Sequence, residues 1–484
     1  MKLTNNMIAG WPKLAWVAVC SNNPAGVAVY HGPLVEATQD RCVEAVWAGD
    51  FAKGDFDRTD LVFGTGVRLR GDDVVFVSSG TTLDRLWHVA LDGRIYVSNT
   101  LPGIMAVAGL ALRPEYRRYQ QDIHTIVKGL ERYERVIPGD PADLHVTYFH
   151  NLRLRGNELR EETKPLSSVP PEDFTAYKAF LFGVARALGD NAADARRRHP
   201  VQLRSTVSSG YDSAASALVA REAGCRESFT IRQSNSLWRG SDSGQDIAER
   251  LGVACRAYDR DSSPIADEGA VWAASGWPGD LNLTWFDYPA PLTLLFTGFH
   301  GDRIWDRERH DVQHSLVRGD ISGLGLCEYR LSRGLFNCPV PYWGAMHAPA
   351  VQAITFSKEM APWTLGNDYD RPIPRRLLEE AGVDRKMFGM RKKNTVVGSA
   401  FHWPTSAYAR KSFSEFLKRN EVDGPMDALV PMYRRLAHAS ALVVNNSIGF
   451  LTRRHYRPGL FLEAQMRAFQ WANHAVSEKY RLRR

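Results

Sequence analysis

The chain has few cysteines, and none of them is placed for metal binding. Among its 484 residues there is no Cys-x-x-Cys pair, and no group of histidines has the spacing of metal ligands. These absences exclude the common zinc-binding modules. We expect free thiols in a reducing compartment at all six cysteines, Cys20, Cys42, Cys225, Cys255, Cys327 and Cys338.

Long apolar runs are also missing, so no segment is expected to cross a bilayer. The first sixteen residues, MKLTNNMIAGWPKLAW, are interrupted by Asn, Gly, Pro and Lys and make a poor signal peptide. We therefore expect a cytoplasmic protein with no membrane partner.

Several catalytic motifs are absent as well. The chain has no Gly-x-Ser-x-Gly, His-Glu-x-x-His or Gly-x-Gly-x-x-Gly motif at a strand-to-helix turn, which argues against an α/β-hydrolase, a zinc protease and a dehydrogenase. The net charge of +7 is mild for this length, and its basic residues form short clusters typical of solvated faces. An anionic substrate or a nucleic acid is the alternative, but no basic motif interleaved with aromatics supports nucleic acid.

Turn signals and apolar patterning divide the chain into two parts. Up to about residue 165, short apolar runs alternate with Gly, Asp and Asn, which predicts an antiparallel sheet domain with a helical stretch around residues 115–135. The proline-rich stretch 164–174 is a candidate linker. We therefore predict domains over residues 1–165 and 170–484, since the length exceeds one ordinary core.

The second part begins with a strand-helix-strand-helix-strand pattern over residues 201–260. This pattern predicts an α/β fold with a doubly wound parallel sheet. A later apolar run, PLTLLFTGFHGD, predicts another buried strand, and amphipathic stretches at 373–382 and 425–444 predict helices.

The sequence SSGYDS, residues 208–213, stands where the first of these strands becomes a helix. Small residues allow backbone N–H groups to approach an anion at a helix N-terminus, and the hydroxyls of Ser208 and Ser213 could donate to phosphate. Asp212 would repel a bare phosphate unless Mg²⁺ neutralised it. The alternatives are a simple tight turn and a helix N-cap formed by Asp212 or Ser213.

A second glycine-rich turn follows the strand PLTLLFT. It contains Gly298 and Gly301, with Asp302 directly after them. Because ligands bind at the carboxyl ends of parallel strands, both turns are expected at one edge of the sheet. Asp212 and Asp302 would then share a Mg²⁺ ion on one polyphosphate.

Four segments together carry a resemblance to a known family: SSGYDS, FTIRQSNSLWRGSDSGQDIAERLGV, TGFHGD and DRPIPRRLLEEAGVDRKMFGMRKKNT. In order and spacing they resemble the ATP pyrophosphatase superfamily, and more narrowly the synthetase domain of asparagine synthetases, a group that includes β-lactam synthetases and lasso peptide cyclases. The resemblance covers residues 202–395 well. It implies an adenine nucleotide α-hydrolase-like fold after an N-terminal nucleophile (Ntn)-like α+β glutaminase domain.

The resemblance also implies a chemistry with ATP and Mg²⁺. A substrate carboxylate attacks the α-phosphate of ATP, pyrophosphate leaves, and an amine then displaces AMP to form an amide. The implied roles are pyrophosphate binding by the two loops, Mg²⁺ binding by Asp212 and Asp302, adenine binding by a strand, and charge stabilisation by one of two lysines. The residues are Ser208, Ser209, Gly210, Asp212, Ser213, Gly298, Gly301 and Asp302 in the loops, Thr230, Ile231 and Arg232 in the strand, and Lys392 and Lys393.

This chain departs from the family pattern at three places. Ser209 replaces the first of two loop glycines, which requires that it avoid positive φ and turn its side chain away. No cysteine follows Met1, so we expect the first domain to be a degenerate glutaminase that does not hydrolyse glutamine. The segment NCPVPYWG lacks the acids and the arginine found at the corresponding place, which argues against ordinary asparagine synthesis.

These observations favour an ATP-dependent amide ligase that takes its amine directly from a substrate. The partners would be a small-molecule or peptide carboxylate and an amine. Two alternatives stay open: an intramolecular macrolactam or β-lactam cyclase, and a nucleotide-binding scaffold without activity.

Overall fold

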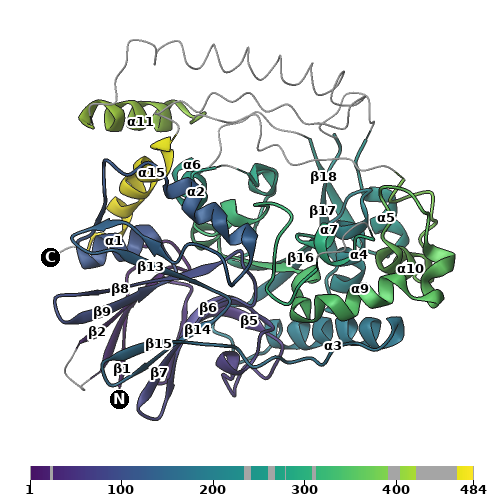
Figure 1. Cartoon of the computed structure of the whole chain (residues 1–484), viewed down its shortest axis with the longest axis horizontal. Coiled ribbons are helices and arrows are strands. Elements are labelled where there is room, and N and C mark those ends of the chain that lie inside the picture. The colour runs from purple at the N-terminus through teal and green to yellow at the C-terminus, as the bar shows by residue number, and fades with distance from the viewer. Residues whose placement is uncertain are drawn as a thin grey trace.

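A computed structural model describes most of the chain (Figure 1). No helix within the described residues combines the length and apolar character needed to cross a bilayer. The described residues are 2–21, 26–233, 241–259, 267–277, 279–307, 312–390, 404–420 and 466–482.

The amino-terminal part consists of two sheets packed face to face, with a third pair of short strands. The first sheet, antiparallel except for one parallel pair at its edge, has the order β1 (Leu3–Met7), β3 (Val27–His31), β2 (Trp16–Ser21), β9 (Arg94–Ser98), β8 (Arg85–Leu91), β13 (Leu144–Tyr148) and β11 (Val136–Ile137). The second has the order β15 (Glu158–Glu162), β14 (Asn151–Arg155), β7 (Asp73–Val77), β6 (Val62–Arg70), β5 (Arg41–Trp47) and β4 (Glu36–Ala37). The short pair is β10 (Ala111–Leu112) with β12 (Gly139–Asp140).

The core between the two large sheets explains their alternating sequence pattern. Trp16 and Val97 from one sheet meet Phe76 and Leu152 from the other, and all four are buried. Each of these strands therefore turns alternate side chains inward, as period-two patterning requires. The predicted antiparallel sheet structure of this part is confirmed, and it comprises two large sheets.

The second part is built on a five-stranded sheet in which every neighbouring pair is parallel. Numbered along the chain, its strand order is 3-2-1-4-5, so the order reverses between β16 and β19. Ligands of open α/β sheets bind at such a reversal point, beyond the carboxyl ends of the strands. The strands are β18 (Ala254–Tyr258), β17 (Glu227–Ile231), β16 (Val201–Thr206), β19 (Leu292–Thr297) and β20 (Leu335–Pro339).

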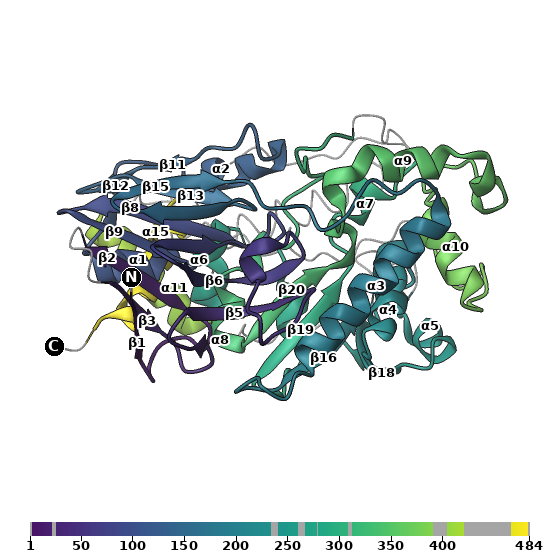
Figure 2. The ribbon, with the colours of Figure 1, turned by 90° about the horizontal axis from the view of Figure 1, so that it is seen from below.

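Helices cover both faces of the parallel sheet, as such sheets require (Figure 2). One face packs against α3 (Phe174–Ala192) and α4 (Tyr211–Glu222), with α5 (Gln245–Arg250) beside α4. The other face packs against α6 (Glu268–Ser275), α8 (Tyr329–Arg333) and 3₁₀ turns at Leu281–Trp285 and Leu324–Leu326. The remaining helices are α1 (Leu101–Ala108), α2 (Tyr119–His124), α7 (Gly301–Ile304), α9 (Ala348–Phe356), α10 (Pro372–Glu380), α11 (Ala407–Arg419) and α15 (Ala468–Ser477).

Two helical segments differ from expectation. The stretch around 115–135 contains only α2 and a 3₁₀ turn over Thr125–Lys128, and it ends at Gly129, whose φ is +89°. The longest helix of the described residues, α3, begins where the linker was expected to end, with Asp173 accepting a hydrogen bond from Ala176 N at 2.7 Å as its N-cap.

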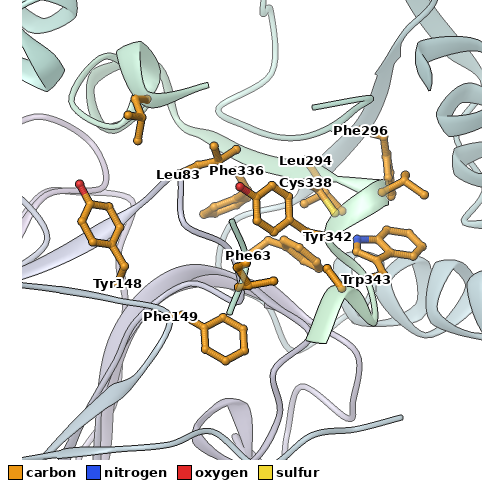
Figure 3. Packing of buried hydrophobic residues seen from close by; sticks show 14 of the residues in the cluster. Phe63, Leu83, Tyr148, Phe149, Leu294, Phe296, Phe336, Cys338, Tyr342 and Trp343 are labelled. Carbon is orange, nitrogen blue, oxygen red and sulfur yellow. The ribbon is translucent and has the colours of Figure 1, made fainter. Parts of the chain in front are cut away.

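The two parts of the molecule share a buried seam (Figure 3). The ring of Trp343 lies 6.1 Å from both Phe63 on β6 and Phe296 on β19. Beside this aromatic contact, Arg330 on α8 pairs with Glu44 (2.7 Å) and Asp84 (2.6 Å), and all three side chains are almost fully buried. The carboxyl-terminal α15 also packs against α1 and α6. The boundary near residues 165–170 stays a prediction.

Candidate functional site

The serine-rich loop connects β16 to α4 and folds around its own hydroxyl groups. Ser213 Oγ accepts a hydrogen bond from Ser208 N at 3.0 Å and lies 2.7 Å from Ser208 Oγ. Gly210 N donates to Ser208 Oγ at 3.2 Å, and Gly210 is the N-cap residue of α4 without any side-chain cap. The loop is therefore not a turn capped by Asp212 or Ser213. Instead, two hydroxyls lie together at the N-terminus of a twelve-residue helix.

Ser209, which stands where the related loops have glycine, has the backbone and side-chain conformation that this position requires. It has no positive φ, and its Oγ donates to Asp242 Oδ1 at 2.6 Å, away from the other loop hydroxyls. Its carbonyl accepts from Gly389 N at 2.9 Å. Gly389 in turn has φ +65° and lies so close to the ring of Tyr211 that a Cβ there would be 2.2 Å from it. The residues after α10 are thus anchored on the serine-rich loop.

The second glycine loop packs directly on Asp212. A Cβ at Gly298 would lie 2.6 Å from the Asp212 carbonyl carbon, and one at Gly301 would lie 2.4 Å from its carboxylate carbon. Only glycine permits this approach. Asp302 follows Gly301 in the first turn of α7. The structure therefore brings together two motifs that the sequence separates by ninety positions.

Arg371 completes this arrangement, and sequence reasoning did not single it out. Its guanidinium is 2% exposed; Nη1 donates to Asp212 Oδ2, and Nη2 to Asp306 Oδ2 at 3.5 Å. Burial by itself lowers the pKa of Arg371, but Asp212 and Asp302 outweigh it and hold the pKa above the ordinary value. Arg371 is therefore a permanent cation at the meeting point of the two loops.

The turn before α10 holds Arg371 in place. Asp370 Oδ2 accepts hydrogen bonds from Leu365 N and Gly366 N, both at 2.9 Å, and the Tyr369 ring lies 5.2 Å from the Arg371 guanidinium. The sequence feature that could have pointed to Arg371 is DRPIP, in which an acid and an arginine stand just before a helix that begins with proline.

No protein-family model matches this chain, and no curated protein matches it either.

Three predicted strand residues lie at the end of β17, beside the serine-rich loop. Thr230 Oγ1 accepts from Gly244 N at 2.9 Å. Arg232 N donates to Tyr258 O, and Arg232 O accepts from Asp242 N at 3.1 Å. The main-chain groups of Arg232 are therefore already used within the protein, whereas Ile231 is buried beside it. Adenine binding by this strand stays a prediction.

Lys392 and Lys393 lie outside the described residues. The described chain reaches Met390, one residue after the Gly389 contact with the serine-rich loop. The assignment of either lysine to the phosphates stays a prediction.

The described residues contain no group of three or more His, Cys, Asp or Glu side chains that could hold a metal ion. Asp212 and Asp302 offer the carboxylate oxygens that Mg²⁺ prefers, and Mg²⁺ commonly takes one or two carboxylates plus substrate phosphates. This donor set fits a cation that arrives with its own phosphate ligands.

Proposed function

We propose that the protein is an ATP-dependent amide ligase that adenylates a substrate carboxylate and couples it to an amine. The observation that carries the proposal is the packing of Gly298 and Gly301 on Asp212 at the reversal point of a parallel sheet. The two loops follow neighbouring parallel strands, and their close approach at the edge where such sheets bind ligands requires glycine at both positions, which supports a shared phosphate site.

The serine-rich loop would bind the β- and γ-phosphates. Ser208 and Ser213 each have a hydroxyl donor, and their mutual contact at 2.7 Å would be exchanged for phosphate oxygens. The positive end of α4 points to the same place.

Mg²⁺ would enter as the counter-ion of ATP, and Asp212 and Asp302 would bind it. Asp212 would then leave its ion pair with Arg371. Arg371, still beside Asp306 and fixed by the preceding turn, would face the phosphates as a preorganised cation.

The reaction would have two steps. A carboxylate oxygen attacks the α-phosphorus, the bond to the β-phosphate oxygen breaks, and pyrophosphate leaves. An amine nitrogen then attacks the acyl carbon, loses a proton and displaces AMP. Arg371 and the loop hydroxyls would stabilise the charge that grows on pyrophosphate in the first step.

The proposal is tested by incubating the full chain with ATP, Mg²⁺ and a panel of carboxylic acids, with hydroxylamine as a general acceptor. We expect equal amounts of AMP and pyrophosphate, together with acyl hydroxamate. Asp212→Asn serves as the matched inactive control. Formation of ADP and phosphate would refute adenylation.

The ion pair between Arg371 and Asp212 favours one alternative, a nucleotide-binding scaffold, because it already neutralises Asp212 without a ligand. Calorimetry separates the two functions. A scaffold would bind a non-hydrolysable ATP analogue with Mg²⁺ in calorimetry, yet in the assay above it would release no pyrophosphate from ATP with any acid.

A further inference from the structure

The serine-rich loop is held from outside by a short strap, residues 241–244, which lies between the loop and the end of β17. Asp242 N donates to Arg232 O at 3.1 Å just after β17, and Asp242 O accepts from Ser209 N at 3.1 Å in the loop. The strap therefore joins the strand that is expected to bind adenine to the loop that is expected to bind the phosphates.

The strap packs so closely on the loop that it has no room for a side chain at Gly244. A Cβ there would lie 2.7 Å from Val207 Cγ2 and 2.8 Å from Ser208 N. Gly244 N donates to Thr230 Oγ1 at 2.9 Å, and an antiparallel bridge pairs Ser243 with Ser208. The place of the strap thus determines where the first residues of the loop lie.

Ser209 gives both of its hydrogen-bond donors to this strap. Its N–H donates to the Asp242 carbonyl, and its hydroxyl donates to Asp242 Oδ1 at 2.6 Å. A serine has only these two donors. Neither is left for a phosphate oxygen, although the family resemblance implied phosphate binding at this position.

Asp242 is an unexpected neighbour for a phosphate loop. The residue is 1% exposed, and a buried carboxylate beside a polyphosphate would repel it. A hydrogen bond to a carboxylate is, however, about twice as strong as one between neutral groups, and it is shorter. The carboxylate is therefore best explained as an anchor for Ser209.

We propose that Asp242 and Ser209 are a pair of positioning residues for the phosphate site. Asp242 holds Ser209, and Ser209 holds the loop so that Ser208, Ser213 and the N-terminus of α4 are in place before the nucleotide arrives. This inference rests on the proposed function and reassigns Ser209 from a phosphate ligand to a residue that acts through its neighbours. Such preorganisation raises affinity because the loop does not have to be ordered on binding.

The test is a double-mutant cycle on the full chain, in which calorimetry measures binding of a non-hydrolysable ATP analogue with Mg²⁺. Ser209→Ala and Asp242→Ala should each weaken binding about tenfold, and so should the double variant, because either change breaks the same bond. Asp242→Asn, which keeps an oxygen acceptor for Ser209, should bind within about threefold of the wild type. Direct phosphate binding by Ser209 would instead make the losses additive, about a hundredfold in the double variant, and would overturn the proposal.

AMP separates positioning of the loop from general damage to the nucleotide site, because it lacks the β- and γ-phosphates. All variants should bind AMP as the wild type does, and an equal loss for both ligands would show a merely structural role and overturn the proposal. Ser241→Ala is the matched control. It removes another hydrogen bond of the strap, to Arg232 O at 2.8 Å, but leaves the Asp242 bonds in place, so binding of the analogue should not change.

Two further outcomes are decisive. Tighter binding of the analogue by Asp242→Asn would show that the carboxylate acts mainly by repelling phosphate, and the proposal would be wrong. Failure of the wild type to bind these nucleotides would refute the proposed function itself, before any variant is compared.

Discussion

Lys164 has an unusual environment that makes a quantitative prediction possible. The residue is 2% exposed, and its ammonium donates to Asn151 Oδ1. Among the described residues it forms no ion pair, although Asp60 and Asp57 are near enough to affect it. Burial lowers the pKa of Lys164 from 10.5 to about 7, and the two carboxylates oppose this only in part.

The pKa difference determines how stability depends on pH. Between about pH 7 and pH 10.5 the unfolded chain binds the proton that the folded chain has lost, so the free energy of unfolding rises with pH. The slope is about 1.4 kcal/mol per pH unit, and the full cost of the charged amine at pH 7 is on the order of 5 kcal/mol. Lys164→Met removes this cost but leaves Asn151 Oδ1 without its donor, which costs about 1–3 kcal/mol. The variant should therefore be the more stable protein at pH 7.

Urea unfolding followed by tryptophan fluorescence at pH 7 and pH 9 checks this prediction. The stability advantage of Lys164→Met should shrink by about 2–3 kcal/mol between the two pH values. Lys53→Met, at an exposed lysine, should show no such change. If the difference between wild type and Lys164→Met is the same at both pH values, Lys164 does not titrate in this range and the argument is wrong.

Three further predictions concern the site and the seam. Asp302→Asn should lower pyrophosphate release by about two orders of magnitude and leave folding intact. The double variant with Asp212→Asn should release pyrophosphate little more slowly than either single variant, because both carboxylates act on one ion. Additive losses of activity would show that the two loops do not share one ion. Gly298→Ala should weaken binding of the ATP analogue at least about tenfold in calorimetry, because its Cβ would lie 2.6 Å from the Asp212 carbonyl carbon. Gly183→Ala on α3, where no atom lies within 4 Å of the added Cβ, should change this binding little, and equal effects of the two substitutions would contradict the close packing. Arg330→Met should lower the free energy of unfolding by about 3–5 kcal/mol in urea titrations, because it leaves the carboxylates of Glu44 and Asp84 buried without a cation. A loss below about 1 kcal/mol would show that water reaches these carboxylates.

Local patterns predicted the parallel sheet well. The strands at β16, β17, β18 and β19 follow from short apolar runs, and α4 and α5 from the amphipathic stretches that end at Gly224 and Gly252. The fifth strand, β20, was missed because its sequence LFNCP is short and ends in proline. The helix α3 was not predicted either, although an N-cap residue, Asp173, and apolar residues at three- and four-residue spacing indicate a helix there.

The candidate site was predictable only in its loops. Glycines and serines at strand ends form turns whose residue preferences are local, so Ser208, Asp212 and Gly301 could be found from the sequence. The pairing of Arg371 with Asp212 joins residues 159 positions apart, and no local pattern reports such a contact.

The packing of α15 also bears on how the protein is made on the ribosome. Just after α15, the ring of Tyr480 lies 5.2 Å from that of Trp11, and its hydroxyl accepts from Thr100 Oγ1 at 3.3 Å. The amino-terminal part thus depends for part of its cover on a residue 380 positions after Thr100. Until α15 and Tyr480 have been synthesised, that part keeps apolar surface exposed, and a nascent chain stalled before residue 468 would be a substrate for chaperones.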